Sequence, residues 1–381
     1  MPYEGLLRPL QLGDFTLKNR IWMSAVSRNR AKNSYPTELM KEYYVQRAVG
    51  GAGLIICAVL EYMWDDKHVA GWKNITDRVH AVGGKIYAQL SHVGRLSHPD
   101  DLNQKLSGLP VYGPSAIPAR GIKFRNVSGG VDDFVPRAVE DPRILIEQFR
   151  HATINAKKAG FDGVEPSADL RKVHACNGML VNQFLDLSCN QRTDEWGGSV
   201  ENRSRFGLEI LKIMIDIFGR NVSVKVNPAG GPSDTGMPLK DTLETFSYFL
   251  SKADKLGVSY IAISRYDSRY DTVIHGVPRG AQHNELESYR PYIKNAKLFL
   301  NGHVTPDEAE LLISQGKIDG VFFGNGWISH PDLAKRLEHG LPLDVPPSVA
   351  HLYGGADEDI WNVGYTTIPL RRTRIWRRRI S

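Results

Sequence analysis

Two side chains with complementary hydrogen-bonding chemistry, His174 and Asn177, stand three residues apart in the 381-residue chain. On one helical turn this spacing puts both on the same side, where they can donate two hydrogen bonds to a carbonyl or phenolate oxygen. Such a pair can polarise an α,β-unsaturated carbonyl, and a purely structural pair is the alternative. A metal site is disfavoured, because no third ligand has suitable spacing.

Other polar residues and glycines stand at or just after short apolar runs elsewhere in the chain. They are Ser24, Ser27, Gln89, Ser91, His92, Lys225, Asn301, Gly302, His303, Gly324 and Asn325. Each of them alone is compatible with an ordinary hydrogen-bonded loop residue. Strand ends present the reacting groups of a parallel barrel, so their joint placement favours one shared site.

The apolar runs alternate with longer helical patterns, which predicts parallel βαβ units and an α/β fold. The expected strands are residues 21–24, 53–58, 85–90, 163–165, 223–226, 260–264, 297–301 and 320–323. Helical patterns include residues 144–159, 200–218, 241–256 and 306–315. Eight strand-then-helix repeats favour a (β/α)8 TIM barrel over a doubly wound sheet.

The expected barrel is a single domain over residues 1–370, followed by a basic tail at 371–381. Residues 97–134, after the third strand, are rich in Gly, Pro and Ser and exceed the usual length of a connection, which predicts a capping loop over the barrel mouth. No GxGxxG follows a strand, so a Rossmann domain is disfavoured.

Composition excludes several classes of protein. The sequence has no apolar run of about 18 residues and no N-terminal signal pattern, so we expect a cytoplasmic protein that binds no membrane. Three cysteines are too few for a disulfide scaffold. The net charge of +6 comes from six arginines of the tail, which we expect to be disordered, and no nucleic-acid partner is expected.

The stretch NQFLDLSCNQRTDEWGGSVENRSRF, from Asn182 to Phe206, combines a polar turn, a Gly-Gly pair and a capped helix start at Ser199. It resembles the signature of the Old Yellow Enzyme family. Similarity extends from about Leu6 to Pro369 and includes NRIWMSAVSRNRA, KIYAQLSHVGR and GVFFGNGWISHPDL. The resemblance implies an FMN-containing TIM barrel in which NAD(P)H reduces the flavin, which then reduces an activated alkene.

The resemblance also implies roles for individual residues. Ala25, Val26 and Ser27 would contact the isoalloxazine, and Gln89 its pyrimidine ring. His174 and Asn177 would hold the substrate oxygen. The phosphate loops would contain Gly302, His303, Gly324 and Asn325.

Several positions depart from the family pattern. Met179 stands where the reducing members place a proton-donating tyrosine, and a thioether has no proton to give. Losing a general acid costs about 10²–10⁴-fold in rate, so Tyr365 or solvent would have to replace it. Lys225 and Asn325 each replace an arginine, near flavin N1 and at the phosphate respectively, which would weaken FMN binding.

The lengths of two segments also differ from the family pattern. Relative to the family pattern, residues 166–172 form an insertion, and the loop after the second strand is short. These two features and the arginine tail are either genuine or errors of the gene model. The leading hypothesis is an FMN-dependent oxidoreductase acting on a small-molecule substrate, a conjugated enal or enone, in specialised metabolism. An isomerase or cyclase without net reduction is the first alternative, since Met179 blocks the final protonation. A cofactor-free scaffold or tail-mediated binder is the second, and an oligomer is compatible with each.

Overall fold

A closed sheet of parallel strands forms the centre of the protein, for which we use a computed structural model describing residues 2–60, 63–121, 134–166, 178–355 and 357–368. The strands of this sheet are β3 (Ile21–Met23), β4 (Ile55–Leu60), β5 (Ile86–Ser91), β8 (Gly163–Pro166), β9 (Ser223–Val226), β10 (Tyr260–Ser264), β13 (Lys297–Asn301) and β14 (Gly320–Phe323). They are hydrogen-bonded in the order β8-β5-β4-β3-β14-β13-β10-β9. A parallel bridge between Val164 and Val222 joins the two ends. The predicted TIM barrel is therefore confirmed.

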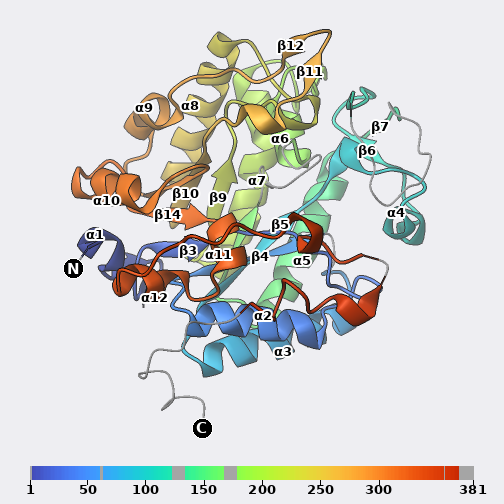
Figure 1. Cartoon of the computed structure of the whole chain (residues 1–381). Helices are drawn as coiled ribbons and strands as arrows, with labels where there is room; N and C mark the ends of the chain where they lie inside the picture. The colour runs from blue at the N-terminus through green and yellow to red at the C-terminus, as the bar shows by residue number, and fades with distance from the viewer. Residues whose placement is uncertain (1, 61–62, 122–133, 167–177, 356, 369–381) are drawn as a thin grey trace.

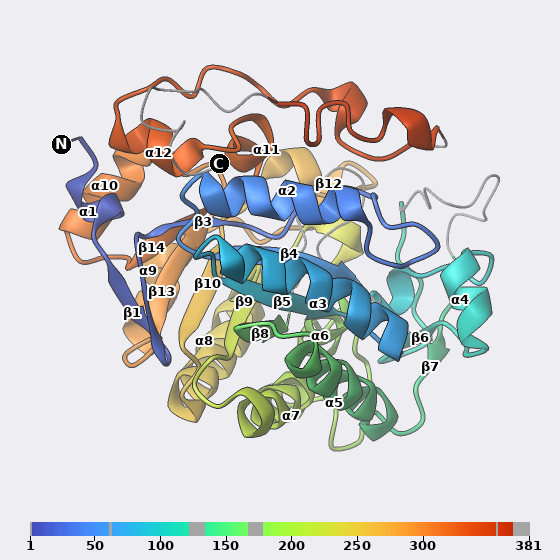
Figure 2. The same cartoon turned by 90° about the horizontal axis from the view of Figure 1, so that it is seen from below.

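Helices surround this sheet on its outer side (Figure 2). They are α2 (Glu38–Val49), α3 (Asp66–Ala81), α5 (Arg143–Lys158), α7 (Val200–Phe218), α8 (Leu239–Leu256), α9 (Glu285–Tyr289), α10 (Pro306–Ser314), α11 (Asn325–Ser329) and α12 (Leu333–Glu338). Ser199 caps α7 by accepting a hydrogen bond from the Asn202 amide, and Thr305 caps α10 through the Glu308 amide.

Shorter elements cover the two ends of the barrel. The N-terminal part forms α1 (Glu4–Leu7) and the antiparallel pair β1 (Leu10–Leu12) and β2 (Phe15–Leu17). After β5, residues 97–134 contribute α4 (Leu102–Ser107) and β6 (Tyr112–Gly113), and β6 pairs with β7 (Arg137–Ala138). The remaining elements are α6 (Leu180–Leu185) and the hairpin β11 (Val273–Ile274) and β12 (Val277–Pro278), which projects at the top of Figure 1.

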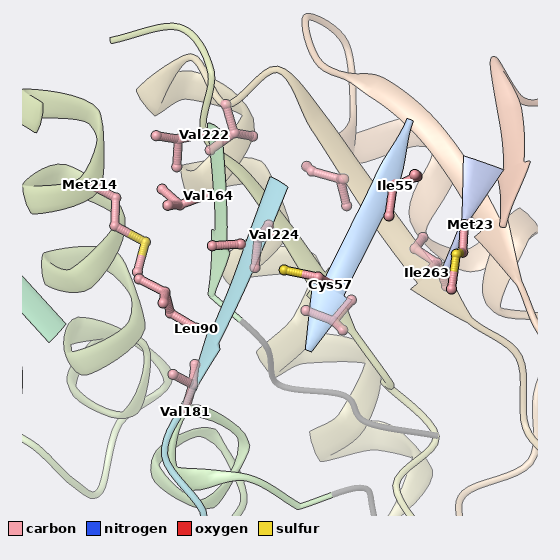
Figure 3. Packing of buried hydrophobic residues seen from close by; sticks show 14 of the residues in the cluster. Met23, Ile55, Cys57, Leu90, Val164, Val181, Met214, Val222, Val224 and Ile263 are labelled. Carbon is pink, nitrogen blue, oxygen red and sulfur yellow. The ribbon is translucent and has the colours of Figure 1, made fainter. Parts of the chain in front are cut away.

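Two apolar layers result from the alternation of side chains along the strands. One layer fills the barrel with aromatic rings, in which Trp22 stacks on Phe299 with ring centroids 3.6 Å apart. The other lies between strands and helices, where Met214 of α7 faces Leu90 and Val164 (Figure 3). The aromatic layer closes the barrel interior, so chemistry is confined to the strand ends.

No helix in the described ranges is long and apolar enough to cross a membrane. The basic residues 371–381 lie outside the part of the chain that the structure describes.

Candidate active site at the carboxyl ends of the strands

The parallel strands bring most of the predicted site residues to one end of the barrel. Ala25, Val26 and Ser27 follow β3, Gln89 lies in β5 and Lys225 in β9. The two glycine loops follow β13 and β14, which are neighbours in the sheet. Parallel strands share a direction, so residues more than 200 positions apart in the sequence meet at this mouth.

Gln89 is held in one orientation by a residue that sequence reasoning missed. Its Nε2 donates to Glu165 Oε1 at 2.5 Å, while the Tyr260 hydroxyl donates to Glu165 Oε2 at 2.6 Å. All three side chains are buried. The Gln89 Oε1 atom is buried as well and has no hydrogen-bond partner among the described residues. An unsatisfied acceptor is costly, so this atom is suited to a ligand that brings an N–H group.

Lys225 supplies a buried cation at the same end of the barrel. Its neighbours Val224 and Val226 pack on the outer layer, so the alternation of the strand directs Lys225 inward. Its Nζ donates to Ser24 Oγ across the barrel at 3.2 Å. Two further acceptors, Asn227 Oδ1 and Asn301 Oδ1, are buried without a partner in the described structure. A buried cation and open acceptors at the same end of a barrel are groups that suit a ring edge that carries N–H groups and develops negative charge.

The glycine loops form the corner where the resemblance places a phosphate. Gly302 and His303 both have positive φ angles, of 95° and 50°, which turn the backbone sharply after β13. Asn301 Nδ2 donates to the Phe322 carbonyl at 3.0 Å and ties this loop to β14. Gly324 precedes α11, whose first residue is Asn325.

Arg269, which sequence reasoning did not single out, brings positive charge to this corner. It donates to Asp267 Oδ2 at 3.0 Å and contacts the ring of His303, whose Nε2 lies 2.6 Å from Asp267 Oδ2. Burial raises the pKa of Asp267, but the hydrogen bonds from Arg269 and His303 outweigh burial and hold that pKa well below its usual range. Arg269 therefore places a guanidinium, paired with Asp267, beside the loop that follows β13.

Met179 packs at the mouth as an apolar residue. It is the N-cap of α6, is 4% exposed, and shares an apolar cluster with Ala25 and Trp22. The Leu180 amide donates to the His92 carbonyl at 2.9 Å and fixes α6 to the end of β5. The position therefore contributes packing and no proton.

Tyr365 lies in a different environment. Its ring stacks on Tyr43 with centroids 4.1 Å apart, and the guanidinium groups of Arg28 and Arg30 lie about 5 Å from the ring centre. It is 2% exposed, and burial raises its pKa. Its apolar contacts belong to the outer layer, separate from the cluster that contains Met179. The structure thus does not bring Tyr365 and Met179 into one cluster.

Two of the predicted residues cannot be placed. His174 and Asn177 lie outside the described residues, as do 167–172 of the expected insertion. The short connection after the second strand runs from the end of β4 at Leu60 to the N-cap of α3 at Asp65.

The carboxyl end of the barrel thus contains, among the described residues, a buried lysine, unpaired acceptors and two glycine turns. In a comparison with known proteins, the model of the NADH:flavin oxidoreductase / NADH oxidase family matches residues 5–344. The chain belongs to this family, to which Old Yellow Enzyme also belongs. Membership makes it an enzyme that uses FMN, with NAD(P)H as reductant.

Individual relatives span almost the whole chain. The protein named "Probable inactive reductase easA" from Epichloe festucae var. lolii is 36% identical over 366 residues, covering 90% of each chain. Chanoclavine-I aldehyde reductase fgaOx3 from Penicillium roqueforti is 32% identical over 380 residues, covering 95% of each. Morphinone reductase in complex with tetrahydroNAD superposes with a TM-score of 0.81 at 32% identity, covering 97% of this chain and 98% of that one.

Proposed function

We propose that this protein is an ene-reductase-like enzyme that reduces the conjugated double bond of an enal or enone in specialised metabolism. The observation that carries the proposal is the carboxyl end of the barrel as described, where Gln89 keeps an oriented, unpaired acceptor and Lys225 is buried. The similarity to an aldehyde reductase supports an aldehyde or ketone substrate.

Each residue has a defined part in this proposal. FMN, when bound, supplies the hydride transfer. Gln89 Oε1 would accept a hydrogen bond from the pyrimidine part of the flavin, and Lys225 would supply positive charge to it. Backbone amides around Gly302 and Gly324, together with Arg269, hold the phosphate. His174 and Asn177 donate to the substrate oxygen and stabilise the developing enolate.

The proton for the α-carbon comes from solvent in this proposal. Met179 has no proton to donate, and Tyr365 is stacked and buried in a separate cluster. Burial raises the pKa of Tyr365, so its hydroxyl stays protonated.

The test is spectroscopic. The purified holoprotein is expected to absorb at about 450 nm, as oxidised flavins do, and to lose this band when NADPH is added without oxygen. Addition of 2-cyclohexen-1-one should restore the band and yield cyclohexanone. A bound flavin that NADPH cannot bleach would overturn the proposal.

An isomerase without net reduction is the second candidate, and buried Met179 at the mouth is the observation that favours it. The Met179→Tyr variant separates the two. Under the reductase proposal it raises the rate of alkene reduction at least about 10-fold, because it restores a positioned acid. A switch from an isomerised product to a reduced product would instead support the isomerase.

A further inference from the structure

Beside the barrel mouth lies a cavity of about 910 Å³ that is lined by Ser91 and His92 of the predicted strand-end residues but by none to which the family resemblance assigns a role. We call it the β5–α5 cavity. Its walls come from the end of β5, the outer face of α5, the residues just before α3, and α4 with the loop that follows it; they include Met63, Trp64, Ser91, Val93, Ile144 and Phe149. Cavities that bind small molecules usually measure about 300–1,000 Å³.

The cavity adjoins the proposed reaction site through two residues. Val93 lines it and also packs against the mouth cluster that contains Met179 and Ala25. Ser91 lines it too and stands two residues after Gln89 in β5, so both side chains lie on the same side of the strand. A ligand reacting at the mouth can therefore extend past Ser91 and Val93 into this space.

The end of the connection from β4 to α3 borders the cavity. Only residues 61–65 separate Leu60 from Asp66, and Met63 and Trp64 in this connection form part of the wall. On the other side, Ile144 of α5 and Leu109 after α4 are large apolar residues that are 45% and 47% exposed. Large apolar side chains exposed around a cavity indicate a surface that binds an apolar partner.

Polar groups at the β5 end of the wall are few. Ser91 Oγ is buried and has no hydrogen-bond partner among the described residues. His92 Nδ1 accepts from the Gly94 amide at 2.9 Å, which leaves the ring proton on Nε2 as a donor. Burial lowers the pKa of His92 to about 4, so the ring is neutral at neutral pH. This end of the wall thus offers donors to an uncharged oxygen.

We propose that the β5–α5 cavity binds the bulky, apolar ring system of the substrate, with an uncharged oxygen of that ring system accepting from Ser91 or His92. This inference rests on the proposed function, and it specifies the substrate as a multi-ring enal or enone. The apolar side chains of the remaining wall, which stand among polar residues such as Gln104, Glu147 and His151, recognise the shape of the ring system.

The experiment compares two tryptophan substitutions on α5. Ala152 lines the cavity, so Ala152→Trp fills it. Ile154 is 39% exposed and lies outside the wall, so Ile154→Trp is the matched control. Testosterone, a four-ring enone, serves as the bulky probe, and its binding to the holoprotein is measured by equilibrium dialysis. Turnover of 2-cyclohexen-1-one with NADPH is measured separately, and the melting temperature shows that each variant folds.

Testosterone affinity is expected to fall at least about 10-fold in Ala152→Trp and to stay unchanged in Ile154→Trp, while turnover of 2-cyclohexen-1-one is unchanged in both. Ser91→Ala is expected to weaken testosterone binding about 5-fold, the effect of one hydrogen bond. Equal testosterone affinity in the wild type and a folded Ala152→Trp, or no testosterone binding by the wild type, would overturn the cavity proposal. Binding that depends on Ala152 in a protein that NADPH cannot reduce would instead overturn the proposed function and leave the cavity intact.

Discussion

Two carboxylates at the amino end of the barrel are fully hydrogen-bonded, whereas several of the described amide side chains at the carboxyl end are not. At the amino end, Asp162 accepts from His80, Lys85 and the Ile86 amide, and Asp254 accepts from three consecutive backbone amides before β13. At the carboxyl end, Gln89, Asn227 and Asn301 each keep a buried oxygen without a partner in the described structure. Satisfied groups hold the fold together, whereas unsatisfied acceptors at strand ends indicate where a ligand completes the structure.

The largest expected effect is a loss of stability caused by a substitution at the amino end of the barrel. Asp254→Ala leaves the amides of Lys294, Asn295 and Ala296 without their acceptor, which should lower the free energy of unfolding by about 3 kcal/mol. FMN affinity of the folded fraction should not change. Urea unfolding and flavin titration measure the two quantities, and exposed Asp216→Ala is the control, with an effect within about 0.5 kcal/mol. A large loss of FMN affinity in Asp254→Ala would break the contrast between the ends.

At the barrel mouth, by contrast, we expect a substitution to change the properties of the flavin. Lys225→Met removes the buried cation, and a hydrogen bond to a charged group is worth about 1.5–3 kcal/mol. For a two-electron couple this lowers the flavin midpoint potential by about 30–60 mV, because the reduced anion loses its stabilising charge. Dye-linked potentiometry measures the shift. Lys240→Met, on the exposed start of α8, should leave the potential unchanged, and an unshifted potential in Lys225→Met would remove Lys225 from the flavin site.

The third prediction concerns pH. Burial raises the pKa of Asp162, but hydrogen bonds from His80, Lys85 and the Ile86 amide outweigh burial and lower it below the ordinary value. A lowered folded-state pKa contributes stability that is present above the unfolded pKa of about 4 and is lost as pH falls through the folded pKa.

The free energy of unfolding of the wild type should fall as the pH drops below about 4. In Asp162→Asn the slope of this fall should be smaller, by at most about 1.4 kcal/mol per pH unit. Urea unfolding at a series of acidic pH values tests this. Equal slopes in the variant and the wild type would show that Asp162 is not the titrating group.

The smallest expected effect tests the orientation of Gln89. Glu165 accepts the hydrogen bond from Gln89 Nε2, so Gln89 presents Oε1 to a ligand. The apoprotein should therefore bind FMN about 5-fold more tightly than 3-methyl-FMN, which is the effect of one neutral hydrogen bond. Glu165→Gln gives Gln89 a neighbour that can also donate, so the preference should shrink. Fluorescence titration measures both affinities, with Glu209→Gln on α7 as control. An unchanged preference in Glu165→Gln would mean that Glu165 does not position Gln89.

Local patterns predicted the elements of the barrel closely. The helix expected at residues 200–218 is α7 as observed, because Ser199 caps its start and Gly219 with positive φ ends it. The strand expected at 53–58 is found two residues later, at Ile55–Leu60. An apolar run buried on both faces has no alternation to mark its ends, so its limits are not encoded locally.

The candidate site was predicted only in part. Gln89 and Lys225 were singled out because they lie within or at the end of apolar strands, and Glu165, which ends another such strand, could have been singled out in the same way. The partnership of Glu165 with Gln89 and Tyr260 joins residues 76 and 95 positions apart, which no spacing rule covers. Arg269 and the β5–α5 cavity were missed for the same reason.

By itself the sequence determined the order of strands and helices, the caps that delimit α7 and α10, and the residue types available at each strand end. Those properties depend on neighbours within a few positions, where propensity and periodicity act directly. Only the tertiary structure decided which oxygen of Gln89 stays open, that Tyr365 stacks on Tyr43 away from Met179, and that a large cavity opens beside β5. These depend on distances between remote segments, and packing of the closed barrel sets such distances.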